Sequence, residues 1–250
     1  MDPIIEKPAK KIHKSLIPYK DPANHRWEIG VDEAGRGPLF GRLYVAAAVV
    51  PNPDSTVPVT VPCPEKAFHY DWMKDSKKFT SEKKIGVVAD HIREAAPFWT
   101  VKHAEPALID EINIRQAVLR LMRECCVDLI RQIQQKHPEC DPEKDVFLLI
   151  DGNDFPIFTL FDERRNEPVV VNAETVEQGD NQYCSIAAAS ILAKVARDQY
   201  IYALCDQDEE LDTKYGLRKN KGYGTKKHLE GLRTYGPTDN HRKSFHVKQT

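Results

Sequence analysis

Two short apolar runs that each end in acidic residues constrain this chain most strongly. Residues 146–150 are continuously apolar and are followed by Asp151, and residues 27–31 run into Asp32 and Glu33. An uninterrupted apolar run of this length is typical of a strand that is buried on both faces. Ligand crevices in α/β folds lie outside the carboxyl ends of such strands, so these acidic residues are candidates for a functional site.

The rest of the chain alternates between strand-like and helix-like segments. Apolar, β-branched and aromatic residues predict further strands at 43–50, 98–101 and 169–171. Apolar residues at helical spacing, with caps and prolines at the ends, predict helices at 81–96, at about 107–135 (one helix or a pair) and at 185–204. The alternation indicates an α/β protein without an internal repeat.

The two ends of the chain differ in character from its middle. Residues 1–26 contain four prolines and no sustained periodicity, so we expect a basic arm that is flexible or loosely docked. Residues 27–250 are expected to form one domain, interrupted by an exposed loop at 51–64 that contains five prolines. The last part, residues 214–250, is basic and aromatic and is expected from its residues to be rich in loops.

The chain has no apolar run near the roughly 18 residues that a membrane helix needs, and no apolar stretch follows the N-terminal lysines. Its six cysteines form no CxxC pair and no zinc-type spacing with histidine. We therefore predict a cytoplasmic protein with reduced cysteines and no membrane partner.

The net charge of −2 hides a strong asymmetry along the chain. The arm carries +3, and residues 214–250 carry ten Lys and Arg against two acids, or +8, which leaves −13 on residues 27–213. An acidic body with a basic end suits a protein that binds a polyanion at one edge and cations in a carboxylate cluster. A solvated basic face is the alternative explanation.

Each candidate site residue also has an ordinary structural explanation. Strand alternation sends Asp32 and Glu33 to opposite faces unless the strand ends there, which Gly35 and Gly37 allow; such a pair is more often a turn or a cap. Asp151 can cap a turn with the glycine that follows it. Asp180 lies just ahead of the helix at 185 and is, taken alone, more often a loop residue.

An aromatic residue flanked by glycines and lysines occurs at residues 221–228. Tyr223 can stack on a base or a sugar while the neighbouring lysines contact phosphates. A surface turn with a packed tyrosine is the alternative.

Taken together, these segments resemble the type 2 ribonucleases H, most closely the bacterial ribonucleases HII. The matching pieces occur in the family's order and are Val31-Asp32-Glu33-Ala34-Gly35-Arg36-Gly37-Pro38, Asp75-Ser76-Lys77-Lys78, Ile150-Asp151-Gly152-Asn153, Gly179-Asp180, Ser185 to Val195, Lys221-Gly222-Tyr223-Gly224-Thr225, Gly236-Pro237 and His241 to Phe245. The resemblance implies a ribonuclease H-like fold over residues 27–250, with a mixed five-stranded sheet flanked by helices and a C-terminal helical, basic extension.

The resemblance also implies roles for individual residues. Asp32, Glu33, Asp151 and Asp180 would be the catalytic carboxylates that bind two Mg²⁺ or Mn²⁺ ions. Gly35, Arg36 and Gly37 would read the 2′-hydroxyl of the ribonucleotide, Tyr223 would stack on the sugar after the RNA-to-DNA junction, and Lys77 and Lys194 would bind substrate. Hard oxygen ligands without a cysteine suit these two metals better than zinc.

The implied activity is an endonuclease that acts on the RNA strand of RNA/DNA hybrids and cuts 5′ of single ribonucleotides in duplex DNA. It would leave 3′-hydroxyl and 5′-phosphate ends and act as a monomer. The sibling ribonuclease HIII is disfavoured by Arg36 within Gly-Arg-Gly. A non-catalytic binding module is disfavoured because all four carboxylates are present.

Overall fold

A computed structural model describes residues 15–54 and 67–245 of the chain. A single mixed sheet with the strand order β3-β2-β1-β4-β6-β5 organises this part of the chain. Its strands are β1 (Trp27–Ala34), β2 (Leu43–Val49), β3 (Phe98–Ala104), β4 (Val146–Asp151), β5 (Phe158–Asp162) and β6 (Glu167–Val176). The pairs β1–β4 and β4–β6 are parallel, and the other three pairs are antiparallel.

The expected five-stranded sheet therefore has a sixth strand, β5, within the described residues. Phe158 and Leu160 point into the core while Phe161 is exposed, so the strand alternates as an edge strand with one covered face should. The hairpin to β6 passes through Asn166 in the left-handed region with φ +55°. A five-residue strand next to a polar turn carries too weak a pattern to stand out in the sequence.

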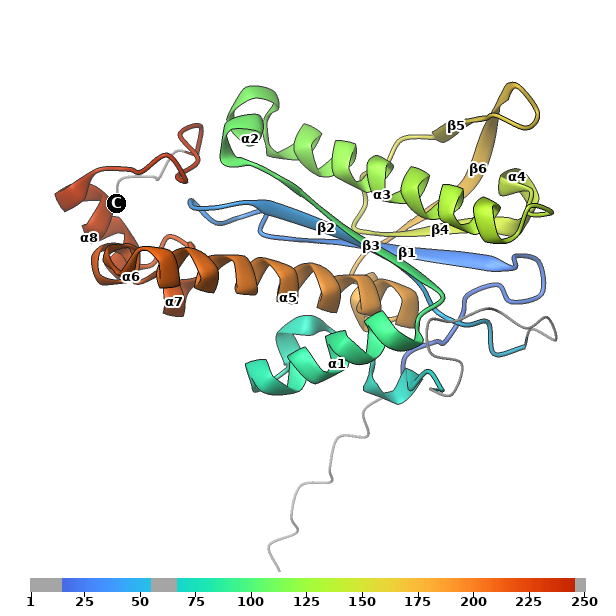
Figure 1. The fold of residues 1–250 in the computed structure, drawn as a ribbon, viewed down its shortest axis with the longest axis horizontal. Helices are drawn as coiled ribbons and strands as arrows, with labels where there is room; N and C mark the ends of the chain where they lie inside the picture. The colour runs from blue at the N-terminus through green and yellow to red at the C-terminus, as the bar shows by residue number, and fades with distance from the viewer. Residues whose placement is uncertain (1–14, 55–66, 246–250) are drawn as a thin grey trace, which may run out of the picture.

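Helices cover both faces of the sheet (Figure 1). The helices are α1 (Glu82–Ala95), α2 (Pro106–Ile112), α3 (Ile114–Lys136), α4 (Pro142–Asp145), α5 (Cys184–Gln207), α6 (Glu209–Tyr215), α7 (Leu217–Asn220) and α8 (Lys226–Tyr235). α3 packs on one face and buries its apolar stripe against β1, β2 and β3. α5 packs on the other face, with α1 beside it.

The helix predictions at 81–96, 107–135 and 185–204 are confirmed. The segment at 107–135 is a pair, because Asn113 has φ +66° and its side chain accepts a hydrogen bond from the Gln116 backbone N–H at 3.1 Å, which caps α3. Ser81 likewise caps α1. Of the helices that the structure describes, none combines the length and the apolarity needed to span a membrane.

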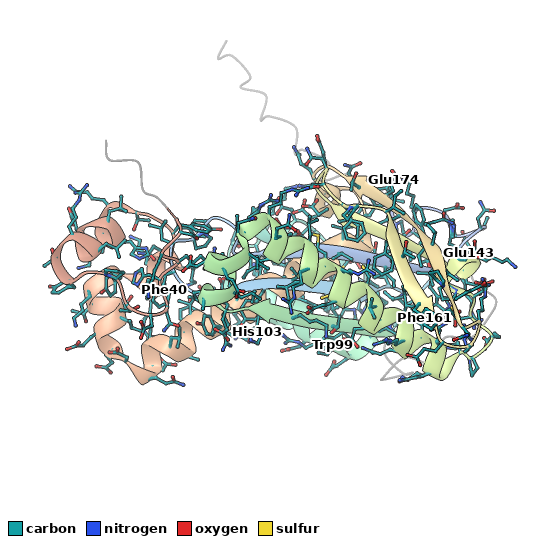
Figure 2. The ribbon with its side chains drawn as sticks, turned by 90° about the horizontal axis from the view of Figure 1, so that it is seen from above. Phe40, Trp99, His103, Glu143, Phe161 and Glu174 are labelled. Carbon is teal, nitrogen blue, oxygen red and sulfur yellow. The ribbon has the colours of Figure 1, made fainter. Side chains whose placement is uncertain are left out.

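The C-terminal segment is helical rather than loop-rich. α6, α7 and α8 lie beyond the end of the sheet, and Phe40 is buried where they meet the body (Figure 2). Phe40 packs there in a small separate core with residues such as Ile201 and Tyr215. The helical extension implied by the resemblance is thus present, and the loops expected from composition alone are wrong for most of it.

The described part of the N-terminal arm, residues 15–26, contacts the body. The Ile17 backbone N–H donates to the Gln182 carbonyl at 2.8 Å, and the Cys184 N–H donates to the Ile17 carbonyl at 3.0 Å. Tyr19 is buried in the core that lies under α5. Residues 1–14 and most of the proline-rich loop at 51–64 lie outside the described residues.

The five cysteines in the described ranges are all buried and free (Cys125, Cys126, Cys140, Cys184 and Cys205). Burial raises the pKa of the Cys125 thiol to about 12. They therefore serve as small apolar side chains, as expected; Cys63 lies outside the described residues.

Candidate active site

Asp32 and Asp151 lie next to each other because their strands are parallel neighbours. Val31 on β1 is opposite Ile150 on β4, so the next residue on each strand, Asp32 or Asp151, lies beside the other at the carboxyl ends of the two strands. Asp32, Glu33 and Asp151 line a single cavity of about 240 Å³. Both residues of the Asp-Glu pair line it although β1 continues to Ala34; the chain turns only at Gly35, with φ +95°.

Asp180 is brought to this edge by a short 3₁₀ turn, η3 (Gly179–Asn181), that precedes α5. One carboxylate oxygen of Asp151 accepts the Gly179 backbone N–H at 2.7 Å, which ties the end of β4 to this turn. The side chain of Asn181 donates to Asp180 at 3.1 Å and lies 3.4 Å from Asp75. Asp180 is buried beside the cavity but is not among the residues that line it.

The carboxylates act electrostatically on one another. Burial raises the pKa of Asp32 well above its ordinary value, and the charges of Asp151 and Glu33 raise it further. Burial, Asp75 and Asp151 together raise the pKa of Asp180 to about 6. Concentrated negative charge of this kind needs a cation or a proton to be stable.

The side chains are nevertheless not preassembled as a metal cage. Within residues 15–54 and 67–245, no group of three or more His, Cys, Asp or Glu side chains lies close enough together to enclose an ion. Asp32 instead accepts the Glu33 N–H at 2.6 Å, and Glu33 lies 3.6 Å from the Arg36 guanidinium.

The Gly35-Arg36-Gly37 loop forms the rim of the same cavity. A Cβ atom on Gly35 would lie 2.3 Å from the Arg197 Nε atom, so only glycine fits at this position. A Cβ atom on Gly37 would instead be in ordinary contact with the Tyr223 ring, at 3.6 Å. Tyr223 is half exposed and lines the cavity, so the structure brings these two candidate recognition elements side by side.

Lys77 and Lys194 also line the cavity. Lys77 is exposed on the 3₁₀ turn η2 (Ser76–Lys78), and its backbone N–H donates to Asp75 at 2.8 Å. Lys194 lies on α5 and pairs with Asp198 at 2.7 Å. Nine of the ten candidate residues therefore line one cavity, and Asp180 adjoins it.

Four cavity residues with polar side chains were not predicted as site residues, namely Ser76, Ser190, Arg197 and Asp198. Ser76 and Ser190 were named only as parts of the matching motifs. Ser190, Lys194, Arg197 and Asp198 follow the spacing i, i+4, i+7 and i+8, which places them on one face of α5. That spacing was a usable signal. Ser76 was not, because its contact with Ser190, at 3.0 Å, spans 114 residues.

Comparison with known proteins places these features in a family context. The profile of the family described as Ribonuclease HII matches residues 29–248. A ribonuclease HII of Neisseria meningitidis serogroup C is 38% identical over 221 residues, which cover 88% of this chain and 93% of that protein. One from Francisella tularensis subsp. novicida is 36% identical over 217 residues, which cover 87% and 95% of the two chains.

Solved structures share the fold at lower sequence identity. The ribonuclease HII of Archaeoglobus fulgidus, solved in complex with PCNA, superimposes with a TM-score of 0.59 and 21% identity over 90% of this chain and 97% of that one. The ribonuclease H2 of Pyrococcus horikoshii OT3 gives a TM-score of 0.58 and 22% identity over 88% and 93% of the two chains.

Proposed function

Because the chain belongs to the ribonuclease HII family and is a ribonuclease H hydrolase, we propose that it cuts both RNA/DNA hybrids and single ribonucleotides embedded in duplex DNA. In the second substrate the cut falls on the 5′ side of the ribonucleotide and leaves 3′-hydroxyl and 5′-phosphate ends. The observation that carries this proposal is one cavity that combines Asp32, Glu33 and Asp151 with the Gly35–Gly37 loop and Tyr223.

Asp32, Glu33, Asp151 and Asp180 are the residues that would hold two Mg²⁺ or Mn²⁺ ions. Their donor set fits, because hard divalent cations prefer carboxylate oxygens. Burial, together with the charges of Asp151 and Glu33, raises the pKa of Asp32, and a bound cation would offset that concentration of charge. Bound ions would neutralise charge on the scissile phosphate and activate water. Since these side chains do not yet form a cage, the proposal requires small side-chain movements when an ion binds.

Recognition of the ribonucleotide is proposed to come from the rim of the cavity. The 2′-hydroxyl is the group by which proteins distinguish RNA from DNA, and the glycines at 35 and 37 allow close approach of backbone donors and acceptors to it. The exposed ring of Tyr223 would stack on the next sugar. Arg36, Lys77 and Lys194 supply positive charge for the neighbouring phosphates.

A cleavage assay with three matched duplexes tests the proposal. One duplex carries a single ribonucleotide, the second is an RNA/DNA hybrid and the third is all DNA, each assayed with Mg²⁺, with Mn²⁺ and with EDTA. We expect metal-dependent cutting of the first two, with the cut mapped 5′ of the single ribonucleotide. Cutting of the all-DNA duplex, or activity that persists in EDTA, would refute the proposal.

A further inference from the structure

Two buried histidines lie directly behind the Tyr223 loop. His228 on α8 is fully buried, and His241, 13 residues later, is 3% exposed. Their Nε2 atoms are 3.1 Å apart. Neither ring is among the residues that line the candidate active-site cavity, so the proposed chemistry has no direct use for them.

The hydrogen bonds at the two outer ends of the pair determine where its protons lie. The Thr238 backbone N–H donates to His241 Nδ1 at 2.9 Å, and the Thr238 hydroxyl, which can also donate, lies at the same distance. Nδ1 of His241 is therefore an acceptor and carries no proton. At the other end, His228 Nδ1 lies 2.9 Å from the Tyr223 carbonyl oxygen, which can only accept. His228 must therefore carry its proton on Nδ1, and the Nε2–H of His241 donates to the bare Nε2 of His228.

This single arrangement satisfies every ring nitrogen with both histidines neutral. The surroundings favour the neutral forms: burial lowers the pKa of both rings, that of His241 to about 4. The rings that face the pair are Phe40 and Tyr215, both within 5.0 Å of the His241 ring by centroid. The Tyr215 hydroxyl is occupied, since it donates to the Gly236 carbonyl at 2.7 Å.

The hydrogen-bonded histidine pair ends at the Tyr223 carbonyl, and the backbone just before this residue adopts a conformation that is uncommon for residues other than glycine. Lys221 and Gly222, immediately before Tyr223, are both in the left-handed region, at φ +50° and φ +84°. The Tyr223 carbonyl accepts a second hydrogen bond, from the Thr225 N–H at 2.7 Å. The His228 bond thus joins this short turn to the segment that contains His241.

The residue after His241 holds the other recognition loop. The Arg242 guanidinium donates to the carbonyls of Pro38 at 2.9 Å and Arg36 at 3.2 Å. One C-terminal segment therefore contacts the Gly35–Gly37 loop directly through Arg242, and it reaches the Tyr223 turn indirectly through His241 and His228.

We propose that His228, which donates from Nδ1 to the Tyr223 carbonyl and accepts at Nε2 from His241, is a positioning residue that holds Tyr223 in register with the Gly35–Gly37 loop. The inference rests on the proposed role of Tyr223 at the RNA-to-DNA junction. Its consequence is that the histidine pair controls the preference for a single embedded ribonucleotide over a continuous RNA/DNA hybrid.

Two substitutions at one position separate the two bonds of His228. Asparagine places an amide N–H near Nδ1, so His228→Asn keeps a donor for the Tyr223 carbonyl and loses the link to His241. Glutamine places its amide near Nε2, so His228→Gln keeps that link and removes the His228 bond to the carbonyl, which retains only the Thr225 N–H. Both variants replace the same buried imidazole ring with a side-chain amide, so they are matched in polarity.

We expect His228→Gln to raise KM for the single-ribonucleotide duplex about tenfold, which is the size expected for one lost buried hydrogen bond. Its KM for the RNA/DNA hybrid should change little. In His228→Asn, the preference for the single-ribonucleotide duplex over the hybrid should stay within about threefold of wild type. Thermal unfolding identifies a variant that fails to fold. Equal preferences in wild type and a folded His228→Gln would overturn the inference, as would an equal loss in both variants.

Tyr223→Ala distinguishes this inference from the function on which it rests. If Tyr223→Ala lowers the preference and His228→Gln does not, only the inference fails. If Tyr223→Ala leaves the preference unchanged, the proposed role of Tyr223 fails and the inference falls with it. In the Tyr223→Ala background, His228→Gln should have no further effect on the preference.

A measurement on the wild-type protein needs no variant to fold. Ring-nitrogen NMR should report a proton on Nδ1 of His228 and on Nε2 of His241. The opposite tautomers in the wild type would overturn the inference, whatever the kinetics show.

Discussion

A Cβ atom built on Gly30 would lie 2.1 Å from the backbone carbonyl carbon of Ser185. The centre of β1 therefore contacts the first turn of α5 backbone to backbone, and the helix begins with small residues that permit this approach. The same helix carries Ser190, Lys194 and Arg197 to the cavity. The spacing between the strand that supplies Asp32 and the helix that supplies these residues is set at Gly30.

Gly30→Ala should destabilise the protein strongly. The obstructing atoms belong to the backbone and cannot rotate away, so we expect a loss of about 3 kcal/mol or more in the free energy of unfolding, at the upper end of overpacking effects. Urea denaturation measures it. Gly86→Ala is the matched control: in α1 the added methyl group meets nothing within 4 Å, and the change should stabilise by up to about 1 kcal/mol. Similar effects of the two substitutions would contradict the close contact.

The convergence of Asp32 and Asp151 was predictable from the sequence, because apolar runs of strand length lead directly into both residues. The position of Asp180 was not. It depends on a 3₁₀ turn that starts after Gln178 in the left-handed region and is held by a hydrogen bond from Gly179 to Asp151. Neither feature has a sequence pattern of its own.

The C-terminal helices show a second limit of sequence reasoning. α6 and α7 are separated by Gly216 at φ +69°, and α7 is followed by Lys221 at φ +50°. Frequent interruptions of the helices and a basic composition are typical of a loop in the sequence. In the structure, however, Phe40 and Tyr215 form a small core for these short helices. That core, like the His228–His241 contact, forms between segments whose proximity only the tertiary fold reveals.

Asp32→Asn and Asp151→Asn should each abolish most of the cleavage activity. Each change removes a negative charge proposed to bind metal while keeping the side-chain shape, so we expect losses on the order of 10²–10⁴-fold in kcat and nearly unchanged duplex affinity. Single-turnover cleavage and equilibrium binding measure the two effects separately. Asp154→Asn, three residues beyond Asp151 and paired with Arg115 outside the cavity, serves as the control. Normal turnover in either site variant would remove that residue from the mechanism.

Glu28 should make stability fall as pH rises from about 4.5 to about 7. The residue is fully buried and accepts hydrogen bonds from Ser185 at 2.7 Å and from the Lys20 N–H at 2.6 Å. Burial raises its pKa to about 7, and these two hydrogen bonds only partly oppose that shift. The folded state therefore holds a proton that the unfolded state releases near pH 4.5, so the stabilisation is complete below about pH 4.5 and is lost as pH rises to about 7.

Chemical denaturation of wild type and Glu28→Gln between pH 5 and pH 8 tests this assignment. The difference in unfolding free energy between them should shift in favour of the variant by up to about 3 kcal/mol as pH rises. Taking the difference cancels the other carboxylates that titrate in this range. A difference that does not change with pH would show that Glu28 is already ionised in the folded protein at pH 5.

Duplex binding should depend strongly on salt, because residues 214–250 carry +8 on an otherwise acidic chain. If about three of these cations contact phosphates, affinity should fall on the order of 40-fold between 50 and 200 mM salt.

Lys219 and Lys227 are exposed and are good candidates for such contacts. Substituting either with glutamine should reduce the slope of log affinity against log salt by about one. The control, Lys144→Gln, lies on α4 at the opposite end of the molecule from α8 (Figure 1) and should leave the slope unchanged. An equal reduction in the control, or a flat salt response in wild type, would place the nucleic acid elsewhere on the surface.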